Sequence, residues 1–386
     1  MKILIVGGTW DNENGKASGL INKMTNSIQT NYYYLKTYNG GNYNELLEIL
    51  NRTPEYDIVF WFANVSNDLP KIRDVKSIAP HVMLITSKRN DNQKYNFQEL
   101  VQRTLAAKAN LTFEFSKQES GKFNIRVFDP LGCEWYYGDD ISTACEAAMN
   151  RLVYLKSITR QSTIQSDDSR ELVLKWYFDS FQQEMLQSKK NIEIPPETKF
   201  IELVHSYAQR FHEIMRPAAN VKRFLGNCSM RPLPPQVGRC SKGMPSFKHD
   251  NYIFVSQRNV NKEYLDINHF VPVYMEDGNI YYCGENKPSV DTPIQLRLYQ
   301  ALPNIKYMLH SHCYIEGAAF TTKTIPCGAI EETDEILHFI DSHYGRRNEN
   351  FYAINLIGHG SILMAATVEQ MNGVNYVGRP MPEKMY

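Results

Sequence analysis

The first part of the chain alternates apolar runs typical of β-strands with amphipathic stretches typical of helices. The strand-like runs are KILIVGG, YDIVFWFAN and HVMLIT, and the helix-like runs between and after them are NYNELLEIL and FQELVQRTLAAKA. This alternation is typical of a parallel sheet that carries helices on its faces. We therefore expect residues 1 to about 112 to form an α/β layer.

Further runs extend this first domain and then interrupt the chain. FNIRVF and CEWYYG predict two more strands, and ISTACEAAMNRLVYLKS predicts a closing amphipathic helix. A polar stretch follows, then the helix-like run LVLKWYFDSFQQEML, and the paired prolines of IPPETKF mark a second break. A chain of 386 residues exceeds the usual size of one domain. We predict a Rossmann-like α/β domain at residues 1–156, a linker and helical connection at 157–194, and a second domain at 195–386.

Charge and composition exclude several classes of function. Lysine plus arginine and aspartate plus glutamate number 42 each, and neither sign forms a long run, which argues against nucleic-acid or membrane-surface binding. No apolar stretch approaches the roughly 20 residues of a spanning helix, and Met1 leads directly into KILIV instead of a signal peptide. The expectation is a soluble, cytoplasmic protein that binds a small molecule. Seven scattered cysteines without a CxxC pair argue against a disulfide framework, and Cys313 and Cys327 are interpreted as buried thiols.

The first domain carries only weak functional signals. Gly7 and Gly8 open the loop GGTWDNENGKASG, whose backbone amides could bind a phosphate, but a strand-to-helix turn needs glycine for its geometry alone. Asn64, Ser66 and Asp68 follow a strand end, where open parallel sheets place ligands. The loop loosely resembles the nucleotide-binding half of phosphopantothenoylcysteine synthetases, which implies nucleotide binding. A scaffold or oligomerisation domain is the alternative.

Two histidines of the second domain lie on a predicted strand. IKYMLHSHC has strand composition, and the strand period of two points His310 and His312 to the same face. Zinc favours imidazole nitrogen and takes about four ligands, so a site here needs further ligands. Without them, the pair could equally be surface residues.

Four motifs surround these histidines in a fixed order. They are GNCS at 226–229, KPSVDTP at 287–293, TIPCGA at 324–329 and INLIGHGSILMA at 354–365. The series resembles the class II aldolase and adducin superfamily, most closely its L-ribulose-5-phosphate 4-epimerase branch, which has the same proline-serine-x-aspartate-threonine-proline run. The resemblance implies an α/β/α domain in which His310, His312 and His359 hold zinc. Adducin-like, noncatalytic relatives lack these histidines, and all three are present here.

The positions of His359 and Asp291 have local explanations as well. Gly358 and Gly360 flank His359 between two apolar runs, which predicts a tight connection between strands. In SVDTPIQLRLYQAL, Ser289 suits the N-cap of a helix, and Asp291 would lie in the first turn, where the helix dipole favours a carboxylate. The resemblance to the epimerase branch implies that Asp291 is a fourth zinc ligand. Aldolases instead carry a glutamate at this position as the catalytic acid/base.

The same resemblance supplies candidate substrate contacts. Sugar-phosphate members bind phosphate through a glycine-asparagine turn, a threonine-glycine pair and two serines. The sequence keeps Gly226, Asn227 and Ser289, and Val290 replaces the second serine. The candidate substrate contacts are Gly226, Asn227, Ser229, Arg258, Asn259 and Ser289. Arg258 and Asn259 replace the threonine-glycine pair. A guanidinium group suits a phosphate, but Arg258 could equally be a solvated surface residue.

The catalytic acid/base and the subunit arrangement are less well defined by the sequence. The segment after His312 is shorter than in the family, and Glu316 is its only carboxylate. Glu331, Glu332, Asp334 and Glu335 open an amphipathic helix and are interpreted as acids favoured by its dipole. The resemblance also implies a symmetric homo-oligomer, in family members a cyclic tetramer with sites between subunits. Tyr376 and Tyr386 of the tail are candidates for a neighbour's site, with Tyr386 as a catalytic residue.

The sequence thus predicts a zinc-dependent aldolase or epimerase that acts on a ketose or sugar phosphate through a metal-stabilised enediolate. It does not choose between cleavage and epimerisation. Two alternatives stay open: an adducin-like, noncatalytic assembly protein, and a bifunctional enzyme whose first domain binds a nucleotide.

Overall fold

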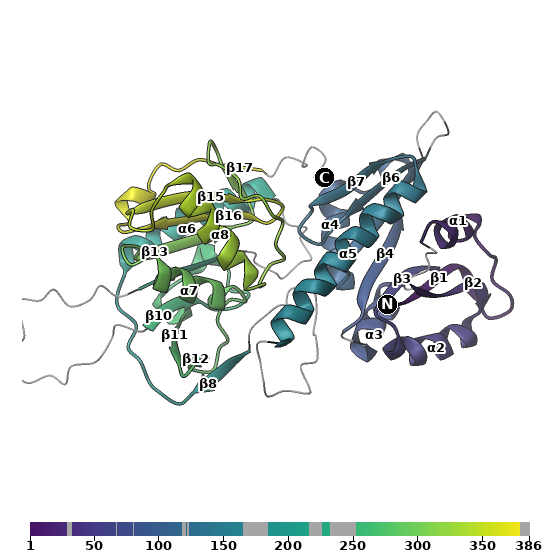
Figure 1. Ribbon diagram of the computed structural model, residues 1–386, viewed down its shortest axis with the longest axis horizontal. Helices are drawn as coiled ribbons and strands as arrows, with labels where there is room; N and C mark the ends of the chain where they lie inside the picture. The colour runs from purple at the N-terminus through teal and green to yellow at the C-terminus, as the bar shows by residue number, and fades with distance from the viewer. Residues whose placement is uncertain are drawn as a thin grey trace, which may run out of the picture. The chain divides into compact units, whose positions relative to one another are not determined.

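The computed structural model describes most of the chain, drawn in colour in Figure 1, namely residues 1–28, 33–66, 68–79, 81–117, 121, 123–164, 184–215, 226–231 and 252–378. The chain divides into two compact units, one within residues 1–180 and the other within residues 181–380. Both units are α/β, as predicted. None of the helices in the described part of the chain has the length and hydropathy needed to cross a bilayer.

The first unit is built on a seven-stranded sheet with the order β2-β1-β3-β4-β5-β6-β7. Its first five strands are parallel, and β6 and β7 continue the sheet in antiparallel pairing. The strands are β1 (Lys2–Asp11), β2 (Tyr34–Asn42), β3 (Ile58–Asn64), β4 (Met83–Arg89), β5 (Leu111–Lys117), β6 (Phe123–Phe128) and β7 (Glu134–Gly138). The predicted parallel α/β layer is confirmed, with an antiparallel extension.

Helices cover both faces of this sheet. They are α1 (Gly19–Ile28), α2 (Tyr43–Arg52), α3 (Asp68–Ile78), α4 (Phe97–Ala107) and α5 (Ile141–Ile164). Leu4 and Val6 of β1 share a buried cluster with residues of α2 and α3, whereas a side chain at Gly7 would meet Ile21 of α1 on the other face. The helix α5 continues to Ile164, so the first residues of the predicted linker are helical.

The second unit is built on an eight-stranded, mostly antiparallel sheet with the order β15-β16-β13-β9-β10-β11-β12-β8. The strands are β8 (Met185–Ser188), β9 (Asn227–Met230), β10 (Tyr252–Ser256), β11 (Phe270–Glu276), β12 (Asn279–Cys283), β13 (Tyr307–Ser311), β15 (Phe351–Leu356) and β16 (Gly360–Ala365). A separate small ribbon pairs β14 (Tyr314–Ile315) with β17 (Tyr376–Val377). The strand β8 lies within the predicted connection 157–194 but belongs to this sheet.

Among the described residues, three helices complete an α/β/α arrangement around this sheet (Figure 1). They are α6 (Thr198–Met215), α7 (Thr292–Ala301) and α8 (Glu331–His343). Residues of α6 share a buried cluster with Tyr307 and Leu309 of β13. Residues of α7 and α8 share another with Met308 of the same strand. Because alternate residues of a strand face opposite sides, His310 lies on the face that α7 and α8 cover.

Candidate metal centre

His310 and His312, which are neighbours in the sequence, meet the distant His359 at the end of β13. One ring nitrogen from each of His310, His312 and His359 lies within 4.8 Å of the other two. The ring centroids are 4.7 Å to 5.1 Å apart, and each residue is at most 4% exposed. The predicted convergence of the three imidazoles is therefore present, and the group is arranged as a metal site would be.

His310 occupies the centre of the sheet, where β13 pairs with β9 on one side and β16 on the other. Its Nδ1 lies 2.9 Å from the carbonyl oxygen of Ser361. Because a carbonyl only accepts, Nδ1 carries the proton, and Nε2 keeps a lone pair. That Nε2 is buried and has no hydrogen-bond partner among the described residues. Burial, together with His359, lowers the pKa of His310 to about 4, so the ring is in the neutral form that binds a metal.

His359 lies in the turn between β15 and β16, as the flanking glycines predicted. Gly360 has a φ of +150°, and a Cβ atom there would lie 2.0 Å from the carbonyl oxygen of Ser311. A side chain at this position would separate the turn from the end of β13. Glycine is therefore required to bring His359 against the strand that carries His310.

A buried carboxylate supports His359. Nδ1 of His359 is 2.6 Å from Oε1 of Glu332, and the side chains are 1% and 5% exposed. Burial raises the pKa of Glu332, and His359 opposes that shift. A carboxylate on the far nitrogen of a ligating histidine fixes the ring and makes it a better donor. Glu332 does lie in the first turn of α8, as the dipole interpretation has it, but that interpretation missed its contact with His359. Its spacing from Ile336 and Phe339, both on the apolar stripe of α8, could have identified it as buried.

We expect Glu332→Gln to lower zinc affinity by about 10–100-fold, the usual cost of losing such a supporting group. The neutral amide can still accept a hydrogen bond from His359, but it no longer makes the ring more basic. Glu349→Gln is a suitable control because it removes a carboxylate that pairs with Arg346 at the surface. Titration against a chelator of known affinity gives both constants. Equal zinc affinity in the two variants would contradict a supporting role for Glu332.

Asp291 faces the same group from the start of α7. Its Oδ2 lies 3.9 Å from Nε2 of His310 and accepts a hydrogen bond of 2.7 Å from Nδ2 of Asn227. The thiol of Cys327 donates to Oδ1 over 3.3 Å. Asp291 itself is the N-cap residue of α7, but its side chain makes no capping bond. The prediction that Ser289 is the N-cap is wrong, since the helix begins at Thr292. The carboxylate is turned toward the histidines and is placed either to bind a metal or to move a proton.

The residues of the GNCS motif mostly contact the protein itself. Gly226 has a φ of +82°, and a Cβ atom there would lie 2.6 Å from the carbonyl oxygen of His310. Asn227 uses its amide on Asp291 and Gln295. The hydroxyl of Ser229 lies 3.1 Å from the hydroxyl of Tyr299 in the core. Contact of these residues with a substrate stays a prediction.

The other candidate substrate residues lie on two segments, 256–259 and 287–289, which are hydrogen-bonded to each other. The amide of Arg258 donates to the carbonyl of Lys287 over 2.9 Å, and that of Ser289 donates to the carbonyl of Ser256 over 3.1 Å. The guanidinium Nε of Arg258 lies 3.4 Å from the carbonyl oxygen of Pro288. Asn259 is exposed in a left-handed turn with a φ of +60°. Arg258 and Ser289 are thus close in space, and their phosphate contact stays a prediction.

Three further sequence predictions have different outcomes. Tyr376 is 1% exposed, and its ring packs edge-on against Tyr207 and Phe211. It therefore cannot reach a neighbour's site, and that prediction is wrong. Tyr386 lies outside the described residues. Cys313 and Cys327 are buried, as predicted.

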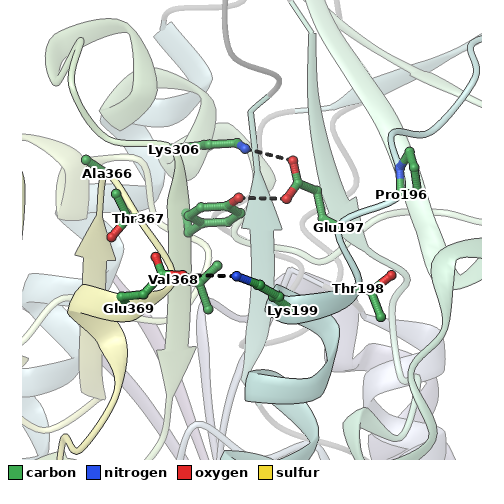
Figure 2. Close-up of a pocket in the computed structure, with 10 residues that line it drawn as sticks. Pro196, Glu197, Thr198, Lys199, Lys306, Ala366, Thr367, Val368 and Glu369 are labelled. Atoms are coloured by element: carbon green, nitrogen blue, oxygen red, sulfur yellow. Dashed lines mark hydrogen bonds and ion pairs between the residues drawn. The ribbon is translucent and has the colours of Figure 1, made fainter.

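A pocket of about 390 Å³ lies near the start of β13 (Figure 2). Its charged groups are paired with one another. Glu197 accepts from the ammonium of Lys306 and from the hydroxyl of Tyr307, each over 2.7 Å, and Lys199 lies 3.5 Å from Glu369. Tyr307 and His310 are on opposite faces of β13 by their spacing. The pocket is therefore distinct from the metal centre. Its charged side chains are already paired with one another, so they give no indication of a ligand.

The glycine-rich loop of the first unit is packed against its own backbone. A Cβ atom at Gly8, whose φ is +75°, would lie 2.6 Å from the carbonyl oxygen of Lys16, and one at Gly15 would lie 1.7 Å from that of Thr9. Close packing thus explains these glycines without a ligand. Asn64 is exposed at the end of β3. Nucleotide binding by this unit stays a prediction.

Comparison with known proteins identifies the second unit. The family described as "Class II Aldolase and Adducin N-terminal domain" matches residues 211–373, a range that contains Asp291 and all three histidines. No curated protein matches the chain in sequence.

Similar solved structures fall into two groups. L-fuculose 1-phosphate aldolase has 16% identity and a TM-score of 0.31, over 46% of this chain and 83% of that one. A DNA/pantothenate metabolism flavoprotein from Streptococcus pneumoniae has 15% identity and a TM-score of 0.33, over 40% and 98%. The C-terminal domain of the coenzyme A biosynthesis bifunctional protein CoaBC has 12% identity and a TM-score of 0.28, over 40% and 96%. At these scores the matches carry no argument about activity.

Proposed function

We propose, on the premise that residues 211–373 form a class II aldolase/adducin domain, that the protein is a zinc-dependent enzyme acting on a ketose or sugar phosphate. The reaction would be aldol cleavage or the related epimerisation next to the carbonyl. The observation that carries the proposal is the buried group of His310, His312 and His359. Noncatalytic adducin-like relatives lack these histidines. A cytoplasmic location belongs to the same proposal.

The surrounding residues prepare this group for metal chemistry. Bound zinc would supply a Lewis acid that stabilises negative charge on substrate oxygens as the neighbouring bond breaks. Ser361 holds the proton of His310 on Nδ1, away from the centre. Glu332 likewise contacts Nδ1 of His359 and so leaves Nε2 of that ring for the metal. Burial of all three rings removes competing water, which strengthens electrostatic interactions within the site.

Asp291 has two possible roles within this proposal. As a ligand it would add a negative charge to the three neutral imidazoles, as in the epimerase branch that the sequence resembles. As a free carboxylate it would accept or return the proton that cleavage requires. Its Oδ2 is 3.9 Å from Nε2 of His310, which favours the ligand role because a ligand must lie close to the histidines.

Purified protein is expected to contain about one divalent metal ion per chain, since the donor set can hold a single ion. It is also expected to cleave or epimerise at least one member of a panel of ketose phosphates. Elemental analysis measures the first, and trapping of the released aldehyde measures cleavage. Protein prepared without chelators that holds no zinc, manganese, cobalt, nickel or iron would contradict the proposal. Metal without any turnover would favour the noncatalytic alternative.

The proposal includes a symmetric homo-oligomer. This part of the proposal is supported by the family resemblance. Family members complete their sites between subunits, and Tyr386 in the tail is the remaining candidate for that contribution. Sedimentation of the protein at micromolar concentration should give a small multiple of 44.7 kDa, with four copies as the expected assembly. A species that sediments as one chain would contradict it.

A further inference from the structure

We propose that Gln295 and Asn227 form a directed relay of side-chain amides that positions the carboxylate of Asp291. The inference rests on the proposed function, because it concerns the carboxylate that faces the metal centre. Gln295 touches neither the histidines nor, on this proposal, the substrate. It is a positioning residue that acts through Asn227.

The relay joins two elements of the second unit. Gln295 lies on α7, one turn after Asp291, and its backbone amide donates to the carbonyl of Asp291 over 3.0 Å. Its side-chain Nε2 donates to Oδ1 of Asn227 at the start of β9. Nδ2 of Asn227 then donates to Oδ2 of Asp291 over 2.7 Å. Asn227 and Gln295 are each 1% exposed, so water does not compete for these bonds.

The direction of the relay is set by its carboxylate end. An ionised carboxylate only accepts hydrogen bonds, so Asn227 must present its nitrogen to Asp291. Its oxygen is then left for Gln295, which must in turn present its own nitrogen. Turning either amide over would place two oxygens or two nitrogens against each other.

The direction of the relay leaves one buried acceptor atom of Gln295 without a hydrogen bond within the described part of the chain. Oε1 of Gln295 is buried and has no hydrogen-bond partner among the described residues. A buried acceptor without a partner destabilises the fold, and neither amide can turn over to satisfy it without breaking the relay. A residue chosen only to fill this space would be apolar, as its neighbours Ile294 and Leu298 are. The amide is explained by its bond to Asn227.

The relay also gives Asn227 a role that the sequence did not predict. The family resemblance implies a phosphate contact for this residue, whereas both polar groups of its side chain already have partners within the protein. The oxygen of Asp291 that Asn227 holds is also the one that lies 3.9 Å from His310. The position of Asn227 therefore controls the atom of Asp291 that faces the metal centre.

Two substitutions at Gln295 test the direction as well as the presence of the relay. Gln295→Met keeps the length of the side chain and removes the donor. Gln295→Glu keeps the shape but replaces the donor with an acceptor when the new carboxyl group is ionised. The oxygen of Asn227 then faces either this carboxylate or, if its amide turns over, that of Asp291. Gln300→Met, at the exposed end of the same helix, is the matched control. We expect Gln295→Glu to lower zinc affinity or kcat more than Gln295→Met does. The control should keep the wild-type values.

The readouts are the zinc dissociation constant, from competition with a chelator, and the separate values of kcat and KM. Zinc affinity should fall by about 10–100-fold if Asp291 binds the metal. If Asp291 moves a proton instead, kcat should fall by a similar factor with little change in KM. The inference is overturned if both variants keep wild-type zinc affinity and kcat, or if Gln295→Glu is the milder of the two. Loss of thermal stability alone would mean that Gln295 is only structural.

Crystal structures of the metal-free wild type and of Gln295→Glu separate this inference from the proposed function. The relay predicts that the bond between Asn227 and Asp291 is lengthened or lost in the variant, whether or not the protein is an aldolase. A carboxylate of Asp291 that stays bonded to Asn227 as before would overturn the inference. Wild-type protein that binds no zinc, with Asp291 displaced in the variant, would count against the proposed function and leave the relay in place.

Discussion

The His310→Ala variant is expected to lose its metal and its activity together. His310 is the central member of the triad, with the neutral ring and the buried lone pair described above. Removing it leaves two imidazoles for an ion that normally has about four ligands. Loss of a supporting group typically lowers metal affinity by about 10–100-fold. We expect the loss of His310 to lower zinc affinity by more than this. Elemental analysis after gel filtration, with chelator competition, measures the loss.

His338→Ala is the control for this variant. His338 is an exposed residue of α8, so its removal changes the histidine count but not the triad. Circular dichroism of both variants checks that the fold is retained. His310→Ala protein that kept zinc at full occupancy would show that His310 is not a ligand.

The Asp291→Asn variant separates the two roles of Asp291. If the carboxylate is a ligand, the variant exchanges an anionic oxygen for a neutral one, and metal and activity should fall together. If it is a free acid/base, the variant should keep its zinc and lose the proton-transfer step, which costs about 10²–10⁴-fold in rate. We expect the first outcome, because the carboxylate is buried against His310.

Measurement of zinc content and turnover on the same preparation decides between them. Asp334→Asn provides the control, since Asp334 is an exposed acid in the first turn of α8. Full zinc occupancy in an inactive Asp291→Asn variant would contradict the ligand role. Because Asn227 donates to Asp291, the new amide must also turn its oxygen toward Asn227, which leaves its nitrogen for the side of Cys327.

The metal centre could be predicted from the sequence where local geometry determined it. A strand period of two is enough to place His310 and His312 on one face, and two glycines around a histidine are enough to predict a tight turn at His359. The series of motifs supplied the connection between these two places. Distance in the sequence does not reveal which turn meets which strand, so this step depended on resemblance to a family.

Residues that act through other residues could not be predicted in the same way. The spacing of Glu332 from the apolar stripe of α8 could predict that it is buried, but only the packing of α8 turns it toward His359. Gln295 lies on a buried helix face, where its partner Asn227 comes from a strand far earlier in the chain. In the first unit, β2 was missed because it is a half-exposed edge strand without a continuous apolar run. In each case the deciding contact is tertiary.

The strand β8 forms one edge of the second sheet, and its length and flanking charges affect whether a further strand can pair there. It pairs in parallel with Ile280–Cys283 of β12, and its own run is only Met185–Ser188. An open sheet edge offers unpaired amide and carbonyl groups on which another chain can add a strand. Here a short strand with Lys189 and Lys190 directly after it occupies that edge. So short a strand, followed directly by two lysines, disfavours the pairing of a further strand at β8 and so protects this edge from edge-to-edge aggregation.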